Sequence, residues 1–291
     1  MQALRCILVV LDPKQPDDLA VKRARLIASV SQARLHLLVA SKDDHDAYLT
    51  RIQQELQGQG MVVTAEQAWH DSLHQTIACV QQAEGCGLVI KQHVPDSALK
   101  RALLTPDDWK LMRYCPCPVL LVKTEAPWTG GNVLAAVDVG NADIEHRTLH
   151  ASIIQHGHQI AALAEGNLHV ITAHPSAMLS AADPAFQLKE TIEARYRAAC
   201  KQFQAEFNIP DGQLHIEEGP ADALIPRVCH QLNAVVTVIG TVARTGFSGA
   251  LMGNTAEVVL DALESDVLVL KPDDIIDHLE QLVAQRCHVR P

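Results

Sequence analysis

Short apolar runs alternate along the chain with longer segments that have helical spacing. CILVVLD (Cys6–Asp12), LHLLVA (Leu35–Ala40) and PVLLVK (Pro118–Lys123) consist largely of Leu and β-branched residues with little polar alternation. Runs of this kind are typical of strands buried on both faces of a parallel sheet. A helical stripe in the second half comprises Ile192, Tyr196, Ala199, Phe203 and Phe207. Strands that alternate with crossover helices predict an α/β fold with a doubly wound parallel sheet.

The order of these runs occurs twice. VLAAVD (Val133–Asp138) ends 126 residues after CILVVLD, and DVLVLK (Asp266–Lys271) starts 148 residues after PVLLVK. Self-similarity with a nearly fixed offset indicates two similar domains in tandem. The larger second offset predicts about twenty extra residues in the second half, over the helical segment 185–207.

A boundary between the two domains is predicted at TEAPWTGGN, residues 124–132. This stretch contains a Pro and a Gly pair between the end of one apolar run and the start of the next. The predicted domains are therefore residues 1–126 and 127–291. The chain continues after Lys271 with a short amphipathic helix, which is assigned to the second domain.

Composition excludes several classes of function. The formal charge of −10, from 24 Lys+Arg and 34 Asp+Glu, argues against general nucleic-acid binding. No apolar stretch approaches the roughly 20 residues of a membrane span, so membrane insertion is not expected. Eight cysteines among 291 residues are too sparse for a disulfide scaffold, which predicts reduced thiols and a cytoplasmic protein.

A glycine-rich loop carries the most specific chemistry. IGTVARTGFSGALMGNTAEVVL (Ile239–Leu260) leaves an apolar run and enters a segment with helical spacing. Glycines let backbone N–H groups approach an anion, and the start of the following helix adds unpaired N–H donors and a positive dipole end. Arg244 is the single fixed cation in this loop. Such an arrangement indicates a phosphate site, although a plain chain-turning loop is the alternative.

The spacing in this loop resembles that of a known family. Gly240-x2-Ala243, nine residues and then Gly253-Asn254-Thr255 resemble the universal stress protein pattern G-x2-G-x9-G-[ST]. The resemblance extends over both halves, through the Asp at the end of each first run and the final PVLLVK and DVLVLK runs, and is closest to tandem members of the family. It implies two domains of universal stress protein type, similar in fold to adenine nucleotide alpha hydrolases, with a role in the response to stress.

The resemblance also implies a site for ATP or a related adenine nucleotide in the second repeat. By analogy, Asp138 and Ala173 line the adenosine end. The residues implied around the phosphates are Gly240, Ala243, Arg244, Gly253, Asn254 and Thr255. Ala243 replaces a family glycine, and a methyl group there weakens binding by about 1 kcal/mol or more, which approaches a tenfold loss of affinity, where φ is positive or a phosphate is close. Asn254 replaces the Ser or Thr hydroxyl, so weak or conditional binding is predicted.

The corresponding segment of the first repeat has lost these features. Lys91 stands in place of Gly240, and Thr105-Pro106-Asp107 stands in place of Gly253-Asn254-Thr255. Pro106 removes an N–H donor, and Asp107 with Asp108 brings negative charge to the phosphate position. No nucleotide binding of the family kind is predicted in this repeat. It either packs against its twin or binds an apolar ligand near Leu99, Leu103, Leu104 and Trp109.

Other chemistry is weakly signalled. His70 with His74, and His146 with His150, have the i, i+4 spacing of two ligands on one helix face, but no further ligand frame accompanies them, so a metal site is not predicted. Cys115-Pro116-Cys117 precedes an apolar run and suits packing. The sequence therefore predicts a binding and regulatory protein, with slow ATP hydrolysis as the enzymatic alternative. Self-association or a protein partner remains open.

Overall fold

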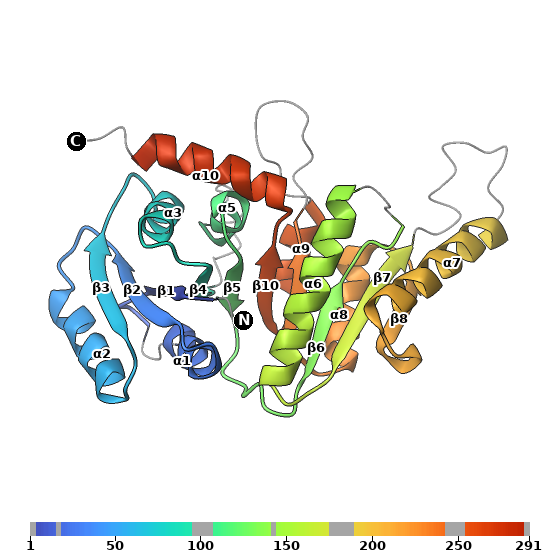
Figure 1. Ribbon diagram of the computed structural model, residues 1–291, viewed down its shortest axis with the longest axis horizontal. Coiled ribbons are helices and arrows are strands. Elements are labelled where there is room, and N and C mark those ends of the chain that lie inside the picture. Colours follow the sequence, from blue (N-terminus) through green and yellow to red (C-terminus); the bar gives the residue numbers. More distant parts are fainter. Residues whose placement is uncertain are drawn as a thin grey trace. The chain divides into compact units, whose positions relative to one another are not determined.

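The computed structural model describes residues 4–15, 19–94, 107–140, 144–174, 189–241 and 254–287 (Figure 1). The chain forms two compact units. Among the described residues, the first unit comprises the chain up to Glu125 together with the segment from Asp273 onward, and the second comprises what lies between. Each unit has the predicted α/β fold with a parallel sheet wound on both sides.

The first unit is built on five parallel strands in the order β3-β2-β1-β4-β5. The strands are β1 (Cys6–Leu11), β2 (Arg34–Ala40), β3 (Val63–Ala68), β4 (Leu88–Gln92) and β5 (Val119–Val122). The helices are α1 (Leu19–Ser31), α2 (Asp46–Gly58), α3 (Leu73–Ala83), α5 (Asp107–Tyr114) and α10 (Asp273–Cys287). Every residue of β1 and β5 is buried, which explains why these runs lack polar alternation.

The second unit repeats this topology with the order β10-β9-β6-β7-β8. Its strands are β6 (Asn132–Ala136), β7 (Leu168–His174), β8 (Leu214–Glu218), β9 (Ala234–Gly240) and β10 (Asp266–Leu270). Its helices are α6 (Ile144–Leu163), α7 (Lys189–Phe207), the 3-10 turn η1 (Asp211–Gln213), α8 (Ala221–Gln231) and α9 (Asn254–Ala262). Helix α7 has 19 residues against 13 in its counterpart α2, as the larger second offset in the sequence predicts.

The C-terminal helix α10 differs from the sequence-based assignment to residues 127–291, because it packs in the first unit. Its buried residues Ile275, Leu279 and Val283 form one apolar face. Helix α3 covers this helix, and Gln82 Nε2 donates a hydrogen bond of 2.9 Å to the Glu280 carbonyl oxygen. Periodicity in a sequence shows which face of a helix is apolar but does not show which surface covers it.

The cysteines also differ from the expectation of reduced thiols. Two disulfides, Cys6–Cys86 and Cys79–Cys287, lie within the first unit. The four other cysteines, Cys115, Cys117, Cys200 and Cys229, are buried thiols. The partners are 80 and 208 residues apart in the sequence, so their spacing gives no sign that neighbouring elements bring them together. The prediction of reduced thiols was wrong because the number and spacing of cysteines do not show which of them meet in the folded chain.

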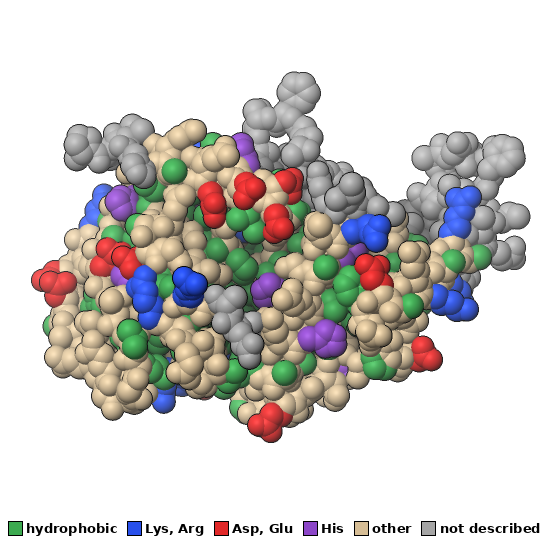
Figure 2. All heavy atoms as spheres, viewed as in Figure 1, with side chains coloured by type: hydrophobic (Ala, Val, Ile, Leu, Met, Phe, Trp, Pro, Cys, Tyr) green, Lys and Arg blue, Asp and Glu red, His purple; other side chains and the backbone are tan. Residues whose placement is uncertain are grey.

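Two observations bear on the excluded classes. None of the helices in the described segments combines the length and apolarity that a bilayer crossing requires. On the face in view in Figure 2, acidic and basic side chains are interspersed in each unit, and no continuous basic surface is visible. A duplex-binding protein instead concentrates Lys and Arg along one surface.

Candidate functional site

The strand order of the second unit creates a natural position for a ligand. Strand β6 is the first strand of this unit and lies between β9 and β7, so the strand order reverses there (Figure 1). Ala136 at the end of β6 pairs with Ile239 of β9 and with Ile171 of β7. In open α/β sheets, ligands bind outside the carboxyl ends of the strands at such a switch point.

Three of the residues singled out in the sequence lie at this edge of the sheet. Asp138 follows β6 and is exposed, Ala173 is the penultimate residue of β7, and Gly240 ends β9. Asn254 and Thr255 begin α9, whose side chains are described only from Val258 onward. Ala243, Arg244 and Gly253 lie outside the described residues. The structure therefore describes the ends of β6, β7 and β9 and the start of α9, but not residues 242–253 of the loop.

Gly240 has a packing role that the sequence did not suggest. A Cβ built on Gly240 would lie 2.6 Å from Leu149 Cδ2 and 3.0 Å from Ile153 Cδ1, both in α6. Carbon atoms that are not bonded do not approach so closely. The glycine thus lets β9 end directly beneath α6, whatever ligand binds beyond it.

Tyr196 of α7 is a further residue at this edge. Its hydroxyl donates to the Ala173 carbonyl oxygen at 2.8 Å, and Asp138 Oδ1 lies at 3.2 Å as a second acceptor. Burial raises the pKa of Tyr196 to about 12, with the Asp138 carboxylate adding to the effect against the hydrogen bond of Thr172. The hydroxyl therefore stays protonated at neutral pH and acts as a donor. A Cβ on Gly140 would lie 2.6 Å from Tyr196 Cε2, so the chain after Asp138 fits closely around the ring.

Sequence reasoning placed Tyr196 only in an apolar helical stripe. The available signal was its hydroxyl, the one polar group among the five residues of that stripe. A buried tyrosine hydroxyl needs a partner, and that need could have directed attention to the site.

The turn after β6 is held by two more side chains. The Asp138 backbone N–H donates to His150 Nε2 at 3.3 Å, and the Val139 N–H donates to Thr172 Oγ1 at 3.3 Å. His150 lies in α6 and is 5% exposed, and its ring is 6.2 Å from that of His146. These two histidines thus share a helix face as their spacing predicts, but His150 accepts a backbone hydrogen bond there.

The first unit contains a buried ion pair near the carboxyl end of β4. The strand register makes Gln92, and not Lys91 as the sequence suggested, the counterpart of Gly240. Lys91 Nζ of β4 lies 2.8 Å from Asp108 Oδ1, and His93 Nδ1 lies 2.7 Å from Asp108 Oδ2. Burial opposes ionisation of Asp108, but the charge of Lys91 and the hydrogen bond with His93 outweigh it and hold the pKa of that carboxyl below its ordinary value. Asp108 lies in the first turn of α5, where the helix dipole also favours a negative charge. Asp108 thus places a carboxylate in the first turn of α5, whereas the corresponding helix of the second unit begins with Asn254 and Thr255.

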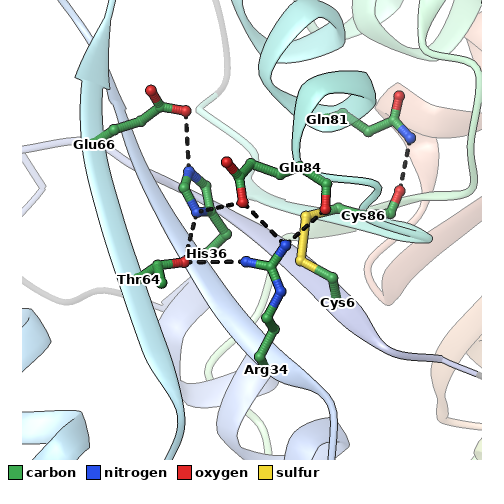
Figure 3. The surroundings of a disulfide bond; sticks show 8 residues. All are labelled: Cys6, Arg34, His36, Thr64, Glu66, Gln81, Glu84 and Cys86. Atoms are coloured by element: carbon green, nitrogen blue, oxygen red, sulfur yellow. Dashed lines mark hydrogen bonds and ion pairs between the residues drawn. A yellow bond between two sulfur atoms is a disulfide. The ribbon is translucent and has the colours of Figure 1, made fainter.

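The histidine pair His70 and His74 is not the helical pair that its spacing suggested. Helix α3 starts at Leu73, so His74 is helical and His70 precedes the helix. Among the described residues, one group has donors close enough to share a metal ion, namely His36, Glu66 and Glu84. Arg34 lies 3.0 Å from Glu84 Oε2 in this group, which is drawn beside the Cys6–Cys86 disulfide in Figure 3. The guanidinium already neutralises the carboxylate that a metal would need.

Comparison with known proteins gives consistent results. Residues 131–271 match the universal stress protein family. The chain is 28% identical to universal stress protein E of Escherichia coli K12 over 298 residues, 92% of this chain and 94% of that protein. It is 30% identical to the universal stress protein E homolog of Haemophilus influenzae over 265 residues, 88% of this chain and 84% of that protein.

Solved structures agree with these relatives. A protein of Pseudomonas aeruginosa UCBPP-PA14 that is designated a universal stress protein is 65% identical, with a TM-score of 0.87 over 97% of this chain and 99% of that one. A universal stress protein of Archaeoglobus fulgidus shares the fold, with a TM-score of 0.62 and 17% identity over 92% of this chain and 97% of that one. From its sequence relatives and its fold, the chain belongs to the universal stress protein family.

Proposed function

We propose that the protein is a cytoplasmic stress-response protein whose second unit binds ATP or a related adenine nucleotide weakly and acts by binding rather than by catalysis. The observation that carries the proposal is the meeting of Asp138, Ala173 and Gly240 at the carboxyl edge of three neighbouring strands. The loop that starts beyond Gly240 has nearly the family spacing, and the N–H groups at the start of α9 suit a phosphate.

Tyr196 supports weak binding. Its hydroxyl already uses the Ala173 carbonyl and one oxygen of Asp138, the two residues assigned to the adenosine end. A nucleoside that uses the same acceptors has to displace this hydroxyl. A hydrogen bond of this kind contributes about 1 kcal/mol net, which corresponds to roughly a fivefold change in affinity.

Titration of the whole protein with ATP in a calorimeter tests the proposal. We expect a dissociation constant between about 10 μM and 1 mM, a range that corresponds to roughly 4 to 7 kcal/mol. Arg244→Gln should weaken binding about fivefold by removing the loop cation, and Tyr196→Phe should strengthen it about fivefold by freeing Asp138 and Ala173. Arg25→Gln removes the same charge from an exposed side chain of α1 and serves as the control.

Two results would contradict the proposal, namely nanomolar affinity or the absence of binding at millimolar ATP. Steady release of phosphate that disappears in Arg244→Ala would instead indicate the enzymatic alternative, a slow ATP hydrolase. Melting temperatures of each variant, measured beside the titrations, separate a loss of binding from a loss of folding.

A further inference from the structure

We propose that the first unit contains a separate binding pocket for small planar aromatic anions, formed by α3, the connection between β3 and α3, and α10. The cavity has a volume of about 740 Å³, which is within the range of small-molecule sites. Its lining contains none of Asp138, Ala173 and Gly240, so it does not depend on the function proposed above. Of the residues suggested in the sequence for a first-repeat ligand, Trp109 does not line this cavity, and Leu99, Leu103 and Leu104 lie outside the described residues.

Aromatic side chains line the pocket. Trp69 follows the end of β3 and is 36% exposed, which is unusual for so large an apolar group. Tyr114 comes from the end of α5, and its ring centroid lies 5.5 Å from that of His74. Flat faces on separate elements suit a flat ligand that stacks on one of them.

The charge of the lining favours an anion. Lys42 and Arg286 are cationic, and Asp71 is the acidic residue of the lining. Lys42 Nζ lies 5.7 Å from the Trp69 ring centroid, so a cation stands beside the aromatic face. Burial lowers the pKa of His74, helped by the positive charges of Lys110 and Arg286 and only partly opposed by Asp107. The lowered pKa favours the neutral form of the His74 ring at pH 7.

The pocket is held in shape from two sides. On one side lies Thr76, which is fully buried. Its hydroxyl oxygen accepts a hydrogen bond of 2.8 Å from the His70 backbone N–H, and the hydroxyl donates one of 2.8 Å to the Ser72 carbonyl oxygen. On the other side, the disulfide between Cys79 of α3 and Cys287 fixes the end of α10, next to Arg286. A site that needs no reordering loses less entropy when a ligand binds.

Calorimetric titration with 2-naphthoate, an aromatic carboxylate, tests the pocket. We expect binding of the whole protein at micromolar to millimolar 2-naphthoate, and at least about fivefold weaker binding of the neutral isostere 2-naphthamide. Arg286→Gln should weaken 2-naphthoate binding about fivefold, and Trp69→Ala about tenfold through lost stacking. Arg25→Gln, which removes one positive charge from an exposed side chain outside the pocket lining, should leave the affinity unchanged.

The proposal is overturned if 2-naphthoate does not bind at millimolar concentration, or if it binds no better than 2-naphthamide. It is also overturned if folded Arg286→Gln and Trp69→Ala both retain the wild-type affinity. Melting temperatures of both variants confirm that they are folded. Arg286 and Trp69 line this pocket and are not part of the proposed nucleotide site, so their substitutions test 2-naphthoate binding separately from the function proposed above.

Discussion

Replacing Cys287 with serine should lower the melting temperature of the oxidised protein by about 10 °C, the largest change expected of any substitution discussed. The disulfide joins residues 208 apart in the sequence, and closing a loop of that length restricts the unfolded chain by about 5 kcal/mol in the chain-entropy account. The variant also releases the end of α10 from α3. Differential scanning calorimetry of the oxidised wild type and of Cys287→Ser measures the effect.

The control uses the same two proteins in a dithiol reductant. Wild type and variant should then melt at the same temperature, since neither contains the Cys79–Cys287 bond. An oxidised wild type that is no more stable than Cys287→Ser would contradict the prediction. In a reducing compartment such as the cytoplasm the same bond would be largely reduced, because thiols there are kept reduced.

Removing the charge of Asp108 should destabilise the first unit by about 3 to 5 kcal/mol, the range measured when one partner of a buried ion pair is lost. The Asp108 side chain is 6% exposed and that of Lys91 is 14% exposed, so Asp108→Asn leaves a cation with little access to water. Urea unfolding, followed by circular dichroism, gives the change in the free energy of unfolding. Asp107→Asn, the same substitution at the preceding residue, provides a matched control.

The control side chain is 49% exposed, and it forms an ion pair of 3.8 Å with Lys110. An exposed pair of this kind contributes about 0 to 1 kcal/mol, so Asp107→Asn should change stability little. Equal effects of the two substitutions would show that the buried pair is not special.

The pH dependence of stability provides a second readout for Asp108. Because the pKa of Asp108 is lowered in the folded protein, its contribution is fully present above the unfolded-state pKa of about 3.9 and is lost as the pH falls through the folded-state pKa. Acidification from about pH 6 to about pH 3 should therefore narrow the stability gap between wild type and Asp108→Asn. A constant gap across this range would rule out the ionised carboxylate as the source of the effect.

The fully buried strands could be predicted from the sequence, but the more exposed ones could not. Strands β1, β5 and β10 are buried along their whole length, and their apolar runs are plain in the sequence. Strands β3 (VTAEQA) and β8 (LHIEE) each have only one neighbouring strand. Most of their side chains are at least partly exposed. A strand with few buried positions needs few apolar residues, so no run marks it.

The candidate site divides in a similar way. Asp138 and Gly240 are detectable because each follows an apolar run, and parallel strands present their carboxyl ends at one edge. Tyr196 arrives from α7 and the Cys79–Cys287 pair joins distant helices, so both depend on how helices pack. Periodicity fixes the buried face of a helix but not its neighbour, and for that reason α10 was also assigned to the wrong unit.

The position of α10 has a consequence for how the protein is made. The strands of the first unit precede the second unit in the chain, yet the helix that covers α3 follows it, so this helix emerges from the ribosome only after the second unit. Domains generally fold as they are synthesised, at about 5 to 20 residues per second. The nascent first unit must therefore wait, with the apolar surface of α3 uncovered, through synthesis of the entire second unit. During that interval of roughly ten seconds or more it is a natural client for a chaperone.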